Sequence, residues 1–214
     1  IQDIKSYRPS SNSVGSGQVL TCPYSFEKAR LVIREMADLL ALDLVDKRLV
    51  TDQLTLTVGY DIENLKNPEK KYSGEVTTDR YGRKIPKHAH GTINLKQQTS
   101  SAKKIVTAVM ELYDRIMDRE LLIRRMYLAA NKVVPEEMIQ EKETFEQLDL
   151  FTDYAALEKQ KQQEEAVLER ERKMQEAMLD IKKKFGKNAI LKGMNLQEGA
   201  TARDRNSRIG GHKA

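Results

Sequence analysis

Polar side chains recur at every second position in three stretches of the chain, and they are the residues best suited to bind a ligand. In 54–60, 90–96 and 125–130, hydroxyl, amide, imidazole and basic groups alternate with apolar ones. Such alternation predicts strands with one buried and one solvated face. The predicted solvated row consists of Thr55, Thr57, His90, Thr92, Asn94, Lys96, Arg125 and Tyr127.

The chemistry of this row favours binding to phosphate. Hydroxyls, amides and cations bind phosphate oxygens without reading base edges. No carboxylate interrupts the row. The same residues also fit the solvated side of an ordinary half-exposed sheet, so composition alone leaves both interpretations open.

Residues that could carry catalysis or hold a metal form no recognisable pattern. Cys22 has no paired base, so we do not expect it to act as a nucleophile. This single cysteine and the histidines at 88 and 90 lack the spacing of a zinc site. The acidic side chains of 158–176 belong to a predicted solvated helix and have no fixed geometry. The sequence therefore predicts no catalytic residue and no metal ligand.

The composition indicates one domain with extensions. The chain has 214 residues, of which 39% are hydrophobic, enough for one modest core. A net charge of +5 permits a polyanionic partner without requiring one. With one cysteine, no signal peptide and no apolar run near the ~20 residues of a membrane span, we expect a soluble cytoplasmic protein without a membrane partner. The first residue is Ile1, which suggests a piece cut from a longer protein.

Two amphipathic helices are predicted between the strands. Apolar residues recur at helical spacing in 26–44, after the candidate N-cap Ser25. The same spacing returns in 105–116, after the candidate N-cap Ser101. The order of elements predicts an α+β fold, a split βαβ (β-α-β-β-α-β) arrangement with two helices on one face of a four-stranded sheet.

We place this domain at 13–135, with 63–86 as a long exposed connection between strands. Residues 1–12 are a predicted linker, 136–152 an extended segment, 153–187 a charged helix and 188–214 a mobile tail. One helical stripe interrupts the charged segment and ends before Gly186. Its residues are Val167, Met174, Met178, Ile181 and Phe185.

Several short motifs resemble those of one protein family. Residues 11–16, which follow 5–9, resemble the tether and first strand that join the thumb of bacterial Y-family (DinB/UmuC-type) translesion DNA polymerases to their little-finger domain. The order of elements and the strand at 88–95 are similar to that domain too. Residues 204–213 resemble the end of UmuC-type polymerases of Gram-positive bacteria. The resemblance rests on the order of these motifs along the chain.

The resemblance implies a role in error-prone DNA synthesis past damage, within the SOS response. The sheet would lie in the major groove and grip the backbone of primer-template DNA. The family's catalysis depends on palm-domain carboxylates that hold magnesium, and their motifs are missing here, so this chain alone should not incorporate nucleotides. Magnesium and the rest of the polymerase chain would then belong to a missing catalytic part. The DNA contacts implied are Ser13, Gly15, Ser16, Thr92, Asn94, Lys96 and Arg125.

A second motif, at 147–151, resembles the peptide by which bacterial polymerases bind the ring-shaped sliding clamp. Its glutamine, Gln147, would satisfy a small polar pocket, and Asp149 would stay in water. Its apolar residues would fill a hydrophobic cleft. Alternatively, these residues pack against the domain or begin the next helix. The clamp-binding residues implied are Gln147, Leu148, Leu150 and Phe151.

Two other classes of function remain open at this point. RNA-recognition modules use the same split βαβ order, but they stack bases on aromatic residues of the central strands. Here the strand at 90–96 presents His90, Thr92 and Asn94 instead. The other alternative is a non-enzymatic adaptor that docks a partner along the apolar stripe of the charged helix.

Overall fold

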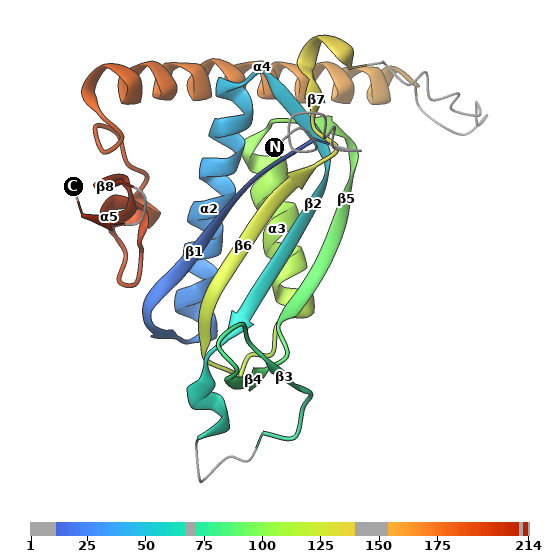
Figure 1. The fold of residues 1–214 in the computed structure, drawn as a ribbon. Coiled ribbons are helices and arrows are strands. Elements are labelled where there is room, and N and C mark those ends of the chain that lie inside the picture. Colours follow the sequence, from blue (N-terminus) through green and yellow to red (C-terminus); the bar gives the residue numbers. More distant parts are fainter. Residues whose placement is uncertain (1–11, 67–71, 140–153, 210–211, 214) are drawn as a thin grey trace, which may run out of the picture.

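Four long strands form one antiparallel sheet, the framework of the molecule (Figure 1). The computed structural model describes residues 12–66, 72–139, 154–209 and 212–213. The sheet order is β1–β6–β2–β5, and a short strand, β7, pairs with the start of β2. These strands are β1 Ser13–Tyr24, β2 Leu49–Tyr60, β5 Ala89–Thr99, β6 Ile123–Asn131 and β7 Val134–Pro135. The helices are α2 Phe26–Asp46, α3 Ala102–Ile116, α4 Tyr154–Phe185 and α5 Ala202–Asn206.

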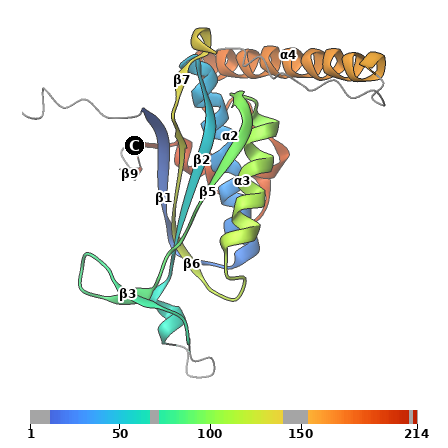
Figure 2. The same ribbon diagram turned by 90° about the vertical axis from the view of Figure 1, so that its right-hand side faces the viewer.

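Helices α2 and α3 each connect two parallel strands that have another strand between them. Helix α2 leads from β1 to β2, with β6 between them, and α3 leads from β5 to β6, with β2 between them. Both helices lie on the same face of the sheet, and the described residues place no helix on the other face (Figure 2). The predicted α+β fold with a split βαβ order is therefore confirmed.

The core lies between these two helices and the sheet. In β2, the side chains of Leu54, Leu56 and Val58 are fully buried, as the alternation predicted. Gly91 allows α3 to approach β5 closely, because a Cβ at this position would lie 2.9 Å from Leu112 Cδ1. The helices contribute further buried residues, among them Ile33, Met36, Leu40, Leu44, Ile105 and Val109.

The two predicted N-caps act differently. The Ser101 hydroxyl accepts a hydrogen bond from Lys104 N at 3.2 Å, as expected for the N-cap of α3. Ser25 stands at the N-cap position of α2, but its side chain makes no capping hydrogen bond. Only its carbonyl accepts one, from Ala29 N at 2.9 Å. Ser25 therefore occupies the predicted N-cap position, but its side chain does not cap the helix.

The segment predicted as an exposed connection contains a small hairpin. It begins with a 3-10 helix, η1 (Ile62–Leu65), and continues with the antiparallel strands β3 (Val76–Thr78) and β4 (Lys84–Pro86). The turn between the strands contains Asp79 and Gly82, and Gly82 has a φ of 76°. Asp and Gly are turn-forming residues. Hydrophobic alternation could not detect the hairpin because each strand is only 3 residues long.

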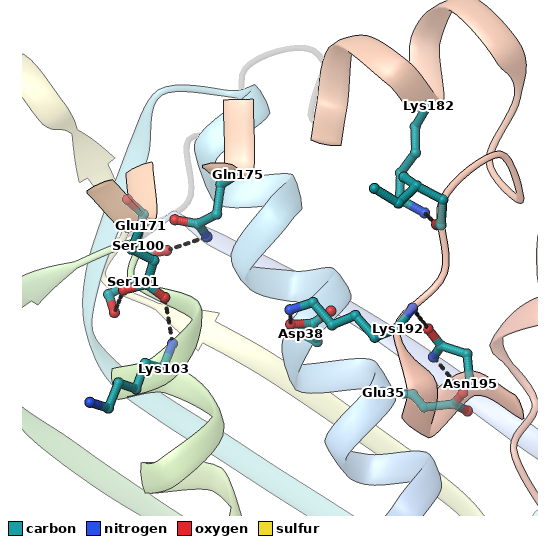
Figure 3. A network of polar contacts seen from close by, with 11 residues as sticks. Glu35, Asp38, Ser100, Ser101, Lys103, Glu171, Gln175, Lys182, Lys192 and Asn195 are labelled. Atoms are coloured by element: carbon teal, nitrogen blue, oxygen red, sulfur yellow. Dashed lines mark hydrogen bonds and ion pairs between the residues drawn. The ribbon is translucent and has the colours of Figure 1, made fainter. Parts of the chain in front are cut away.

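Helix α4 is attached to the domain through polar contacts, shown in Figure 3. The Glu171 carboxylate accepts hydrogen bonds from Ser101 Oγ at 2.6 Å and from Lys103 N at 2.8 Å. It thereby satisfies donors at the N-terminus of α3. Gln175, only 3% exposed, donates to Ser100 O at 3.2 Å. The expectation of a fully solvated helix is therefore wrong for this part of α4.

Only part of the apolar stripe predicted on α4 belongs to its contact face. Met178 is buried, whereas Val167, Met174 and Phe185 are more than half exposed. Ile181 is intermediate. The contact face includes hydrogen-bonding side chains such as Gln175, which hydrophobic periodicity does not register. Because Met178, in the middle of the stripe, is buried against the domain, it is not free to dock a partner as the adaptor alternative requires.

The tail after α4 folds back along α2. It contains the 3-10 helix η3 (Gly193–Leu196) and helix α5. The Glu35 carboxylate of α2 is 1% exposed and accepts a hydrogen bond from Asn195 Nδ2 at 2.7 Å. It also accepts from the backbone N–H groups of Thr201 and Ala202, at 2.8 and 3.1 Å. The predicted mobility of this tail is wrong for its described part, because a buried carboxylate needs the donors that the tail supplies.

Removing the Glu171 carboxylate should destabilise the protein. Glu171→Ala leaves two donors at the N-terminus of α3 without their acceptor, and losing a capping acceptor costs about 1 kcal/mol. Urea denaturation should therefore show a lower midpoint. Glu169→Ala is the matched control, because Glu169 lies on the same helix and forms an exposed ion pair with Lys173, a kind of contact that contributes little. Equal midpoints for the two variants would show that Glu171 does not hold α4 in place.

Candidate nucleic-acid interface

Three rows of side chains cross the open face of the sheet, which we define as the face without helices. The antiparallel register aligns one residue from each of β1, β6, β2 and β5 in every row. The first row is Ser13, Asn131, Gln53 and Asn94; the second is Gly15, Ala129, Thr55 and Thr92; the third is Gly17, Tyr127, Thr57 and His90. None of the three rows contains a carboxylate.

Hydrogen bonds between neighbouring strands hold these side chains in place. The bonded atom pairs are Gln53 Nε2 to Asn94 Oδ1 (2.9 Å), Asn131 Nδ2 to Thr55 Oγ1 (2.7 Å), Thr55 Oγ1 to Thr92 Oγ1 (3.0 Å) and Thr57 Oγ1 to His90 Nδ1 (2.8 Å). Hydroxyl and amide groups can donate and accept more than one bond, so the rows keep capacity for a ligand. Because the side chains are already ordered, binding would cost them little conformational entropy.

A shallow depression of about 390 Å³ lies at the hairpin end of the open face. Arg125 crosses it next to Gly59, where a Cβ would be 2.6 Å from Arg125 Cγ. Only glycine at this position gives the arginine side chain its room. The depression is lined mainly by Gly17, Val19, Gly59, His88, Arg125 and Tyr127.

The structure places most of the predicted DNA contacts on or beside the open face. Ser16 is the exception, because it pairs with Leu128, whose side chain is in the core. The Ser16 side chain therefore belongs to the helix-covered face of β1 and does not join the rows. The residues on the open face or exposed at its ends are Ser13, Gly15, Thr92, Asn94, Lys96 and Arg125.

The two predicted cations lie at opposite ends of this face. Arg125 is at the hairpin end, and Lys96 is exposed at the end next to α4. The pKa of the Glu164 carboxyl in α4 is lowered mainly by its hydrogen bond from Lys104, and the charges of Lys103 and Lys96 lower it further. The charge of Lys96 therefore acts partly on this carboxylate of α4.

Sequence reasoning missed Gln53 and Asn131, which complete the first row. Both lie just outside the predicted strands, although each continues the alternation by one step from Thr55 or Ala129. His88 was not predicted as a binding residue, although it begins the strand at 88–95 on which the resemblance partly rests. Its place in the depression follows from the start of β5 at Ala89, directly after the hairpin.

The predicted clamp-binding motif lies outside the described residues. Its positions, Gln147, Leu148, Leu150 and Phe151, fall within 140–153, between η2 (Glu136–Met138) and the first residue of α4. The structure therefore does not test this prediction.

No group of three or more His, Cys, Asp or Glu side chains in the described part of the chain could hold a metal ion. Cys22 is a free, exposed thiol. None of the described helices combines the length and hydropathy required to span a membrane.

A family model described as "impB/mucB/samB family C-terminal domain" matches residues 11–150. A solved "Complex of beta-clamp processivity factor and little finger domain of PolIV" is 9% identical, with a TM-score of 0.33, and the match covers 66% of this chain and 100% of that one. An "Insertion ternary complex of Dbh DNA polymerase" is 11% identical, with a TM-score of 0.34, covering 62% of this chain but only 33% of that one. The search of curated proteins gave no match.

Proposed function

Because this chain belongs to the impB/mucB/samB family of Y-family polymerases, as the family model over residues 11–150 shows, we propose that its open face grips the backbone of primer-template DNA during translesion synthesis. The sheet domain is the little-finger domain of such a polymerase. This assignment sets aside the RNA-recognition alternative. Nucleotidyl transfer, with its magnesium, belongs in this proposal to another part of the polymerase.

The observation that supports this function best is the composition of the three rows. They present hydroxyls, amides and an imidazole, with a cation at each end of the face and no carboxylate within them. Such groups contact phosphate oxygens of any sequence. Binding that depends on phosphate contacts is weak, little affected by base sequence and strongly reduced by salt. A polymerase that copies damaged templates needs a grip of this kind.

Replacing both cations should weaken DNA binding and its salt dependence. The Lys96→Ala, Arg125→Ala double variant should bind duplexes of different sequence equally poorly. Each lost phosphate contact should reduce the slope of log K against log salt by up to about 0.9. A salt titration by fluorescence anisotropy measures both quantities.

The matched control removes one lysine and one arginine elsewhere. Lys173 and Arg170 are exposed on α4, away from the open face, so their double alanine variant changes the net charge equally. It should bind nearly as the wild type does. If the Lys96 and Arg125 variant instead titrated like this control, the open face would not be the DNA-binding surface.

We also propose that the segment at 147–151 binds the sliding clamp as an extended peptide. The support is its sequence, a glutamine followed by two leucines and a phenylalanine at the spacing of clamp-binding peptides. The described residues that flank the segment, Ile139 and Tyr154, follow η2 and begin α4. In Figure 1 these elements lie at the end of the sheet opposite the hairpin. A peptide attached there can hold a weakly binding domain near DNA by raising its effective concentration.

Truncating the apolar anchors should abolish clamp binding. In calorimetric titrations of a bacterial sliding clamp, Leu150→Ala and Phe151→Ala should each cost about 2 kcal/mol or more, because buried apolar anchors dominate small interfaces. Gln147→Ala should cost less. Asp149→Ala is the control within the motif and should change little, because its side chain stays in water. Equal affinities for the wild type and the Leu150, Phe151 double variant would refute the assignment.

A further inference from the structure

The hairpin formed by β3 and β4 presents an exposed aromatic ring. Tyr81 lies in its turn and is 80% exposed, compared with 47% for Tyr127 on the open face. The neighbouring side chains are mostly basic: the sequence from Asp79 to Lys84 contains three cations and one carboxylate. Aromatic rings next to cations are typical of surfaces that bind single-stranded nucleic acid.

The turn holds the backbone of Tyr81 in a fixed conformation. Asp79 Oδ1 accepts hydrogen bonds from the N–H groups of Tyr81 and Arg83, both at 2.9 Å. Arg83 Nε donates to Asp79 Oδ2 at 2.8 Å, and the two contacts from Arg83 lower the pKa of the Asp79 carboxyl, the side-chain bond most. Gly82, at φ 76°, closes the turn through its N–H to Asp79 O at 3.0 Å. The lowered pKa keeps the carboxylate ionised, so it can accept the hydrogen bonds that cap the turn.

One face of the ring is already supported. Arg83 Cζ lies 5.2 Å from the centre of the Tyr81 ring, a cation–π contact. Because the residue is nevertheless 80% exposed, the other face of the ring remains open to solvent. The base of the hairpin is anchored as well, since Ile85 is 9% exposed and Lys87 N donates to Glu75 O at 2.8 Å. The ring is thus presented on a rigid support.

Two cations beside the ring are available for a ligand. The carboxylates of Asp79 and Glu75 are each paired with a cation of the hairpin segment, Arg83 or Lys87. Arg80 and Lys84 are exposed, and no ion pair joins either of them to a described residue. The side chains around the ring therefore carry a net positive charge, and two of the cations have no ion-pair partner among the described residues.

The hairpin also projects on the same side of the molecule as the open face. Figure 2 shows it projecting from the end of the sheet on the side away from α2 and α3, the side of the open face. His88, two residues after β4 ends at Pro86, lines the depression that Arg125 crosses. The open face, the depression and the hairpin therefore follow one another along one side of the molecule.

From this arrangement we propose that the hairpin turn binds single-stranded DNA next to the duplex held on the open face. Tyr81 stacks on an unpaired base, and Arg80 and Lys84 contact the flanking phosphates. An unpaired base offers a free face for stacking, whereas bases inside a duplex are already stacked on both sides. The inference rests on the proposed function, because it assumes that the open face holds the duplex.

The test compares two DNAs that share one duplex, one blunt and one with a single-stranded template extension. Binding of the full chain is measured by fluorescence anisotropy at a fixed salt concentration. The wild type should prefer the extended DNA. Tyr81→Ala should weaken binding to the extended DNA at least about fivefold, the lower end of the effect of one base stack. Its binding to blunt DNA should be unchanged.

Two further variants separate stacking from other effects. Tyr81→Phe keeps the ring and should bind both DNAs as the wild type does. Phe185→Ala is the matched control: Phe185 is 67% exposed and Lys184 Nζ lies 5.2 Å from its ring centre, but it ends α4, away from the open face. It should not change the preference for extended DNA.

The outcomes distinguish this inference from the proposed function. If Tyr81→Ala keeps the wild-type preference, or weakens both DNAs alike, the hairpin does not bind the single strand, even if the Lys96 and Arg125 variant weakens both. The same conclusion holds if the wild type shows no preference for extended DNA. If the Lys96 and Arg125 variant binds both DNAs normally, the open face itself is misassigned.

Discussion

The packing of both helices on one face of the sheet is the constraint on which the rest of the molecule depends. Helices that connect parallel strands cross over with one handedness, and here both connections lead to the same face. The side chains of Leu54 and Leu56 are buried beneath them, so Thr55 and Thr57 must face the opposite way. Because the apolar side chains pack against the helices, the polar ones are left on the open face. Because both helices are on the other side, no helix of the described residues covers the open face.

The described segments that follow the domain also attach to the helices and leave the open face free. Helix α4 attaches through Glu171 at the N-terminus of α3, and the tail attaches through Glu35 of α2, where Lys192 also pairs with Asp38. Both attachments use carboxylates that gather several donors, and both lie on the helices. These attachments are mainly polar and bury few apolar side chains, such as Met178 and Ala202, so the tail can be rich in charge and still be ordered. The open face and the hairpin remain uncovered by the described residues.

Sequence patterns anticipated the sheet, both helices and most of the open face, because residues such as Leu54 and Val58 alternate cleanly with hydroxyl side chains. They did not place Ser16, since glycines on either side of it carry no side chain from which a face can be assigned. They also missed how α4 and the tail attach. Glu171 and Ser101 are separated by 70 positions, and their hydrogen bond has no local pattern. Long-range polar docking is visible only once the fold has brought its partners together.

The contact between Glu171 and α3 has a mechanical consequence. The part of α4 before this contact forms an arm that projects beyond the sheet domain (Figure 1). Tension applied along that arm would reach the domain through the ion pair of Glu164 with Lys104 and through the hydrogen bonds at Ser100, Ser101 and Lys103. Ser100 directly follows the last residue of β5, so the load would pass into a strand of the open face. Helix α4 is therefore placed to transmit a load to the sheet.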